Sequence, residues 1–255
     1  MLTNKNMDGR PLISVITITY NASETLPLTM KSVGEQTFHD FEHLVVDGAS
    51  TDDTIILARQ MGKPGLRIVS EPDEGLYYAM NKGLKMASGR YLIFLNSGDR
   101  FHDADSLKSY AEAIKKKSPD IIYGDTDIVD IKGKRIGPRH LSAPEILTVD
   151  SFSHGMLICH QAFMVRKDIA PLYDTDFRYS ADYDWCIRCI KASRAGDRVN
   201  LHKVTIDYLA DGLTDKHKKA SLIERFKIMA AHYGSMKAVA AHLSFIPRAL
   251  KRGKL

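Results

Sequence analysis

Strand-forming and helix-forming segments alternate along the first half of the chain, and this alternation limits the fold more than any other feature. Residues Ile13 to Thr19 form an apolar run rich in β-branched side chains, which is typical of a strand buried in a parallel sheet. A helix is expected from Ser23, a good N-cap residue, to about Gly34, and a second strand follows at Phe41 to Val46. The sequence therefore predicts the α/β class, with a mostly parallel, Rossmann-like central sheet flanked by helices.

The same alternation continues to about residue 123 and then becomes less regular. Ser50, with Asp53 three residues later, resembles a capping box and predicts a helix that ends near Met61. After Gly124 a hairpin is expected around residues 132–134. Further strands are expected at 66–69, 91–95, 121–123, 163–165 and 199–208, and further helices at 77–87, 104–117 and 184–192. We expect one domain in two halves, residues 11–125 and a smaller mixed half at 126–212, followed by a helical tail at 213–255.

The positive charge of the chain is concentrated in this tail. The total formal charge is +5, whereas residues 216–255 hold ten Lys and Arg and one Glu, a net of +9; subtracting this from the total leaves −4 for residues 1–215. A solvated helix, a nucleic-acid contact and attachment to an anionic membrane would each explain a basic helical tail. An apolar face combined with many Lys and Arg residues suits an interfacial helix, so we expect an anionic membrane surface as the partner. Stacking aromatic residues are too few to favour nucleic acid. One face of the tail is expected to carry Leu222, Ile223, Phe226, Met229 and Ala230.

No targeting or membrane-spanning segment is expected. The first ten residues lack the apolar stretch of a signal peptide, and no apolar run is long enough to cross a bilayer. We therefore expect a cytoplasmic protein, peripheral to the inner face of the cell membrane. Cys186 and Cys189 are three residues apart, but no second Cys or His pair has zinc-ligand spacing, so all three cysteines are expected to be reduced thiols in the core.

A polar turn, Asn96-Ser97-Gly98-Asp99, follows the strand expected at 91–95. Open α/β sheets bind ligands at the carboxyl ends of their strands. The amide oxygen of Asn96 and the carboxylate of Asp99 would suit Mg²⁺ or Mn²⁺ bridging to a diphosphate, because both cations prefer oxygen ligands. The alternative is a type I turn whose Asn and Asp only bind the backbone.

Four segments together resemble one known family. They are Thr-Tyr-Asn at 19–21, Val-Val-Asp-Gly-Ala-Ser at 45–50, Gly-x-Tyr-x-Ala-Met-Asn-Lys-Gly at 75–83 and Phe-Leu-Asn-Ser-Gly-Asp at 94–99. The chain resembles the inverting glycosyltransferase family 2, which has the GT-A fold, and especially its bacterial polysaccharide enzymes of the colanic-acid type. The resemblance covers about residues 11–210. It implies that residues 11–125 bind a nucleotide sugar and that residues 126–212 form the acceptor side of the same domain.

The resemblance also assigns donor-binding residues. Asp47 would accept the ring N–H of the nucleobase, whereas an Asx turn that only shapes its loop is the alternative. Asn96 and Gly98 stand where the family has carboxylate positions, so Asp99 would be the one charged metal ligand, and metal affinity without substrate should be weak. The donor-binding residues implied are Thr19, Tyr20, Asn21, Asp47, Ser50, Asp73, Asn81, Asn96 and Ser97.

The second half must supply a base, because an acceptor hydroxyl loses its proton as it attacks the anomeric carbon. Ser-Ala-Asp-Tyr-Asp-Trp at 180–185 resembles the Glu-Asp doublet of the family, with Ala181 in place of the Glu and Asp182 as the catalytic base. His160 and Gln161 match a His-Gln pair expected near donor and acceptor. Trp185 would pack either against a sugar face or in the core.

The resulting prediction is an inverting glycosyltransferase that moves a sugar from a nucleotide sugar, most simply a UDP-sugar, to a glycan or lipid-linked acceptor in bacterial cell-surface polysaccharide synthesis. A nucleotidyltransferase is one alternative, but Tyr20-Asn21-Ala22 occupies the place of its Gly-rich phosphate loop. A non-catalytic nucleotide-sugar-binding protein is the other, because carboxylates are missing at Asn96 and Ala181.

Overall fold

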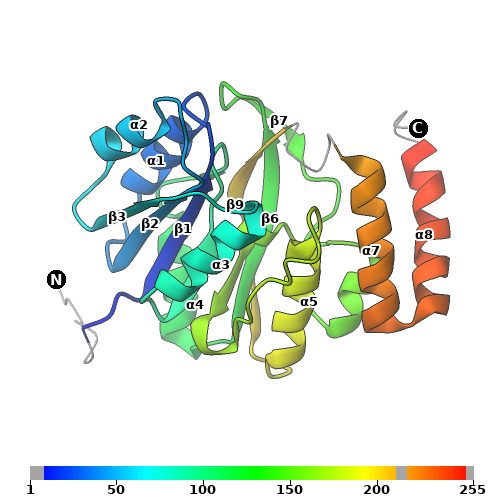
Figure 1. The fold of residues 1–255 in the computed structure, drawn as a ribbon. Helices are drawn as coiled ribbons and strands as arrows, with labels where there is room; N and C mark the ends of the chain where they lie inside the picture. The colour runs from blue at the N-terminus through cyan, green and yellow to red at the C-terminus, as the bar shows by residue number, and fades with distance from the viewer. Residues whose placement is uncertain (1–8, 211–216, 251–255) are drawn as a thin grey trace.

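The computed structural model describes residues 9–210 and 217–250 and shows one curled sheet flanked by helices, which confirms the α/β class (Figure 1). The strands are β1 (Ile13–Thr19), β2 (Phe41–Asp47), β3 (Leu66–Ser70), β4 (Tyr91–Phe94), β5 (Arg100–Phe101), β6 (Ile121–Val129), β7 (Arg135–Pro138), β8 (Phe163–Arg166) and β9 (Arg198–Leu209). The α-helices are α1 (Leu26–Gly34), α2 (Thr54–Met61), α3 (Leu76–Met86), α4 (Ser106–Lys117), α5 (Ala181–Ala192), α7 (Lys218–Tyr233) and α8 (Ser235–Leu250). Three short 3₁₀ helices are η1 (Val149–His154), η2 (His160–Ala162) and η3 (Lys167–Ile169).

The sheet has a parallel part and a mixed part. Its strand order is β3-β2-β1-β4-β8-β6-β9-β5, with β7 beside β6. The strands β3, β2, β1 and β4 are parallel, whereas β8 runs antiparallel to both β4 and β6. The parallel strands come from the first half of the chain and the mixed strands mostly from the second. The carboxyl ends of β1, β2, β3 and β4 therefore lie at one edge of the sheet, as the alternation of segments predicts.

The core explains why α3 lies close to the sheet. All seven residues of β1 are buried, as expected for a strand covered on both faces. A Cβ on Gly83 of α3 would lie only 2.5 Å from Cγ2 of Ile16, so a glycine there permits the close approach of helix and strand. Tyr77, six residues earlier in α3, is buried as well. The three cysteines are buried free thiols, which confirms the expectation for them.

Helices α1 and α2 begin later than the sequence predicts. Helix α1 has Thr25 as its N-cap residue, rather than Ser23. Helix α2 begins at Thr54, rather than directly after Ser50. The reason is the side chain of Asp52, which accepts hydrogen bonds from the backbone N–H of Thr54 (3.0 Å) and from that of Ser23 (3.1 Å). Asp52 thereby joins two loops that are distant in the sequence, and both helices start after the joined segment.

The C-terminal tail is helical, as predicted. Helices α7 and α8 lie side by side at one end of the molecule (Figure 1), and the ring of Phe226 on α7 contacts that of His242 on α8, with centroids 5.2 Å apart. Leu222 and Ile223 are exposed, whereas Met229 is buried. Residues 213–216 and 251–255 of the predicted tail lie outside the described residues. Within 9–210 and 217–250, no helix combines the length and apolarity needed to cross a membrane.

Candidate active site

Polar residues gather where the parallel strands end. Thr19, the last residue of β1, is in register with Asp47, the last residue of β2, and Asp47 is in register with Ser70 at the end of β3. The backbone N–H of Ser97, in the turn after β4, donates to the carbonyl of Ile18 (3.1 Å). The structure therefore brings together the four polar strand ends at the edge where such sheets bind ligands.

Asp47 is fully buried and shapes its own loop. Its Oδ2 accepts hydrogen bonds from the backbone N–H of Ser50 (2.8 Å) and from the hydroxyl of Ser70 (2.6 Å). Its Oδ1 accepts a hydrogen bond from the hydroxyl of Ser50. These contacts agree with the alternative in which Asp47 forms an Asx turn, because its carboxylate binds Ser50, the residue expected to cap the next helix. A contact from Asp47 to a nucleobase stays a prediction.

The loops after β1 and β2 are joined by side chains of the predicted donor-binding set. Asn21 has a positive φ of 45°, its N–H donates to the hydroxyl of Ser50 (2.8 Å), and its Oδ1 accepts from the N–H of Thr51 (2.9 Å). The Oγ1 atom of Thr19 is buried and has no hydrogen-bond partner among the described residues. Tyr20 remains 65% exposed, so its ring is accessible for stacking.

Gly48 provides the space between two other predicted donor residues. A Cβ at Gly48 would lie 3.0 Å from Oδ2 of Asp73 and 3.2 Å from Cδ2 of Tyr20. The other carboxylate oxygen of Asp73 accepts the N–H of Gly75 (2.9 Å) and so fixes the loop before α3. Tyr20 and Asp73 are therefore held beside the same glycine, and any larger residue at Gly48 would push them away.

Asn81 and Ser97 have protein partners. The amide of Asn81 donates from Nδ2 to the carbonyl of Tyr173 (3.0 Å) and accepts at Oδ1 from the N–H of Tyr173 (2.7 Å). Asn81 thus anchors the segment before α5 to helix α3. The hydroxyl of Ser97 lies 3.2 Å from that of Thr25, which ties the turn after β4 to the start of α1.

The turn after β4 presents one unpaired oxygen and one buried carboxylate. Oδ1 of Asn96 is buried and has no hydrogen-bond partner in the described part of the chain. Oδ1 of Asp99 accepts the N–H of Leu209 (2.9 Å), and its Oδ2 accepts Nε2–H of Gln161 (2.5 Å). Burial raises the pKa of Asp99 to about 7, and these hydrogen bonds together with nearby His160 offset only part of that effect.

These features fit a divalent cation. An unpaired amide oxygen and a carboxylate in one turn are oxygen ligands of the kind that Mg²⁺ and Mn²⁺ prefer. Burial raises the pKa of Asp99, and a cation bound beside this carboxylate would favour its ionised form. Asn96 and Asp99 are therefore the residues here that would hold the metal.

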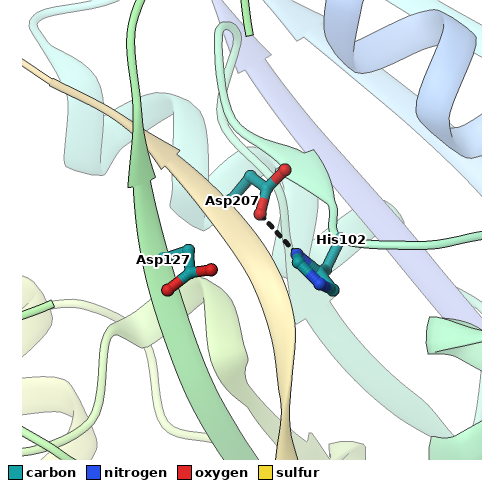
Figure 2. Close-up of side chains that lie close together, drawn as sticks. All are labelled: His102, Asp127 and Asp207. Atoms are coloured by element: carbon teal, nitrogen blue, oxygen red, sulfur yellow. Dashed lines mark hydrogen bonds and ion pairs between the residues drawn. The ribbon is translucent and has the colours of Figure 1, made fainter. Parts of the chain in front are cut away.

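A second group of possible metal ligands was not predicted from the sequence. Figure 2 shows His102, Asp127 and Asp207, whose ligand atoms all lie within 4.8 Å of one another. Nδ1 of His102 lies 2.6 Å from Asp207, which also pairs with Arg100 at 2.7 Å. Asp127 pairs with two guanidinium nitrogens of Arg135. Because each carboxylate already faces an arginine, this group fits a cation less well than the turn after β4.

Asp182 lies in the first turn of α5 and meets two residues from other elements. Its Oδ1 accepts a hydrogen bond from the hydroxyl of Tyr77 on α3 (3.0 Å), and its Oδ2 lies 3.4 Å from Nδ1 of His160. Burial alone would raise the pKa of Asp182, but the hydrogen bond and charge of His160 outweigh it, helped by Arg225 and Tyr77. The pKa of Asp182 is consequently below its usual range, so the carboxylate is ionised at neutral pH.

His160 and Gln161 connect the two acidic groups. Both belong to the short helix η2, and their side chains contact Asp182 and Asp99 respectively. The contacts of His160 and Gln161 with the two aspartates were not predicted from the sequence. Contacts of the same two residues with donor or acceptor stay a prediction. Nε2 of His160 is buried and has no hydrogen-bond partner within the described residues.

Trp185 is a core residue. Its side chain is fully buried, its ring stacks on Tyr173 with centroids 4.9 Å apart, and its Nε1–H donates to the carbonyl of Pro171 (2.7 Å). Trp185 therefore packs in the core, which was one of the two predictions for it. The other prediction, contact with a sugar face, is wrong because no face of the ring reaches the surface. Tyr77 is the residue that sequence reasoning missed, although it belongs to the Gly-x-Tyr-x-Ala-Met-Asn-Lys-Gly segment.

Comparisons with known proteins identify sequences and folds similar to those of this chain. The model of the family described as glycosyl transferase family 2 matches residues 14–171. A PGL/p-HBAD biosynthesis glycosyltransferase of Mycobacterium bovis (strain BCG / Pasteur 1173P2) is 34% identical over 220 residues, which cover 81% of this chain and 82% of that protein. The structure of S. aureus TarS 1-349 in complex with UDP-GlcNAc has a TM-score of 0.69 and 19% identity over 91% of this chain and 73% of that chain. The mannosyltransferase PcManGT from Pyrobaculum calidifontis, in complex with GDP-Man and Mn²⁺, has a TM-score of 0.61 and 16% identity over 96% and 77%.

The structural likenesses confirm the fold, and the sequence matches identify the family. The family model covers more than half of the chain, and the mycobacterial relative is similar over most of its length. The chain therefore belongs to glycosyltransferase family 2 and is a glycosyltransferase with the GT-A fold.

Proposed function

We propose that this enzyme transfers a sugar, with inversion, from a UDP-sugar to a hydroxyl of a glycan or lipid-linked acceptor in bacterial cell-surface polysaccharide synthesis. The observation that carries the proposal is the ionised, partly buried Asp182, joined through His160 and Gln161 to the Asp99 turn. A base and a cation site connected in this way suit attack by a hydroxyl on one side and departure of a diphosphate on the other. The UDP-GlcNAc of the TarS complex supports the donor class, and the name of the mycobacterial relative, a glycosyltransferase, supports sugar transfer.

The donor half holds the nucleotide sugar in this proposal. Tyr20 offers its exposed ring to the base, while Thr19 and Asp73 line the same region. Asn96 and Asp99 would hold Mg²⁺ or Mn²⁺, and the bound cation would neutralise charge that develops on the leaving diphosphate. The donor residues fix the anomeric carbon in front of the acceptor site, so positioning supplies part of the rate.

Asp182 acts as the general base. It takes the proton of the acceptor hydroxyl as the oxygen forms a bond to the anomeric carbon, and the bond from that carbon to the diphosphate oxygen breaks. Attack from the face opposite the leaving group inverts the anomeric configuration. Tyr77 and His160 each hold one oxygen of the carboxylate and so limit its rotation.

The direct test uses Asp182→Asn, with Asp176→Asn as the matched control because Asp176 is exposed and lies six residues earlier. We expect Asp182→Asn to abolish transfer from UDP-sugars while donor binding, measured by titration calorimetry with Mn²⁺, stays unchanged. The control should keep full turnover. Equal loss of turnover and donor binding in Asp182→Asn would rule out its role as the base.

We also propose that helices α7 and α8 bind the enzyme to an anionic membrane. On α8, Met236, Val239 and Leu243 are exposed at spacings of three and four residues, which places them on one helix face. Exposed Lys218 and Lys219 open α7. An apolar stripe on α8 and basic residues at the start of α7 together suit the interface of an anionic bilayer, so the enzyme would lie peripherally on the inner face of the cell membrane.

Vesicle sedimentation tests this location. The protein should sediment with phosphatidylglycerol vesicles and not with phosphatidylcholine vesicles, because the attraction needs anionic lipid. Replacing Met236 and Leu243 by Ser should release it. Equal sedimentation of the variant and the wild type would exclude the α8 stripe as the contact.

A further inference from the structure

Helix α7 contacts the segment directly before α5, the helix that carries Asp182, through the carboxylate of Glu224. Oε1 of Glu224 accepts the backbone N–H of Arg178 (2.9 Å), and its Oε2 accepts the N–H of Tyr179 (2.8 Å). Two consecutive N–H groups therefore share one charged side chain from a segment about 45 residues later. Hydrogen bonds to a charged acceptor are stronger than those between neutral groups.

Other contacts from α7 continue along the same segment. The hydroxyl of Ser221 lies 2.9 Å from that of Ser180, the N-cap residue of α5, and both residues are buried. One turn into α5, Nε2 of His232 lies 2.7 Å from Oδ1 of Asp184. Helix α7 thus contacts residues on both sides of Asp182 in the sequence.

Glu224 holds the last residues before α5, whereas Asn81 of α3 holds the same segment farther back, at Tyr173. Residues 170–180 form an irregular segment between η3 and α5, with a turn at 175–176 and bends at 178–179. Within the described chain, the side chain of Ser180 makes no hydrogen bond to the first turn of α5. The direction in which α5 begins, and hence the place of Asp182 in its first turn, is set by contacts with neighbouring elements.

We propose that Glu224 is a positioning residue for Asp182, which makes helix α7 a part of the catalytic apparatus rather than only a tail. The proposal rests on the function proposed above, in which Asp182 is the base. Without the Glu224 carboxylate, two backbone N–H groups lose their acceptor, and the backbone at Arg178 and Tyr179, directly before α5, can shift. A displacement of about 1 Å at a reacting group is enough to cost about 100-fold in rate.

The test compares Glu224→Ala and Glu224→Gln with Glu112→Ala, in which an exposed glutamate of α4 is removed instead. We expect Glu224→Ala to lower kcat by about 10- to 100-fold, with KM and Kd for the UDP-sugar within about twofold of wild type. Glu224→Gln keeps one acceptor oxygen and should lose less. Amide hydrogen exchange at Arg178 and Tyr179 should accelerate in both Glu224 variants and stay unchanged in Glu112→Ala.

The outcomes separate this inference from the proposed function. If Asp182→Asn is inactive but folded Glu224→Ala and Glu224→Gln both keep the wild-type kcat, the positioning role is wrong and the proposed function stands. An equal loss of kcat and donor affinity in Glu224→Gln would also overturn the positioning role, because it indicates general unfolding. If Asp182→Asn keeps its turnover, both the base assignment and the role of Glu224 are refuted.

Discussion

Removing the hydroxyl of Tyr77 tests whether its hydrogen bond keeps the carboxylate of Asp182 ionised. Tyr77→Phe removes one oxygen from a buried residue and leaves its ring in place, where it stacks on Tyr173. The lost interaction is the 3.0 Å hydrogen bond to Oδ1 of Asp182. The charges of His160 and Arg225 still face the carboxylate in the variant.

The size of the effect follows from that one hydrogen bond. A hydrogen bond to a charged group contributes about 1.5–3 kcal/mol. Since about 1.4 kcal/mol corresponds to one pKa unit, its loss should raise the pKa of Asp182 by about 1–2 units. The contact favours the ionised form, so its contribution to the free energy of unfolding is present above the unfolded-state pKa of about 3.9. That contribution disappears as the pH falls through the lower pKa of the folded protein.

The assay is the pH dependence of kcat/KM for wild type, Tyr77→Phe and Tyr78→Phe. Tyr78 is the adjacent residue of α3, is 38% exposed, and provides the same chemical change away from Asp182. The acidic limb of the profile should move upward by about 1–2 pH units in Tyr77→Phe alone. An acidic limb shared by all three proteins would refute the view that Tyr77 stabilises the ionised base.

Two further predictions concern Asp99, in the turn after β4, and Gly83, in the core. In metal-free protein, the raised pKa of Asp99 should lower the free energy of unfolding as the pH rises from about 4 to about 7, by up to about 4 kcal/mol. Urea unfolding should show this loss in the wild type and not in Asp99→Asn. Gly83→Ala should lower the free energy of unfolding by about 1–3 kcal/mol, because the new methyl group meets Ile16, whereas Ala at open Gly137 should have little effect.

The sequence predicted the sheet better than the starts of the helices. The limits of β1 agree with the prediction because a strand buried on both faces is apolar throughout. Strand β5 escaped prediction because its two residues carry no periodic signal. The starts of α1 and α2 were misplaced since Asp52 joins their loops in three dimensions, which local capping rules do not consider.

The site was predictable where its residues follow strands and unpredictable where distant segments meet. Asn96 and Asp99 stand out locally because a polar turn follows an apolar strand. The contact between Tyr77 and Asp182 joins residues 105 positions apart, and that between Gln161 and Asp99 joins residues 62 apart. No spacing rule reaches over such separations, so these partners emerge only from the folded chain.

The two departures from the family motifs have one electrostatic consequence in common. Ala181 is fully buried, so a Glu at this position would place a buried negative charge next to the partly buried Asp182 and raise its pKa. Asn96 likewise replaces a carboxylate in the turn of Asp99, whose pKa burial already raises to about 7. Each substitution removes a like charge from the neighbourhood of the aspartate that remains. The chain therefore keeps one acidic group at each position and relies on Tyr77, His160 and Gln161, rather than on paired carboxylates, to hold those groups in place.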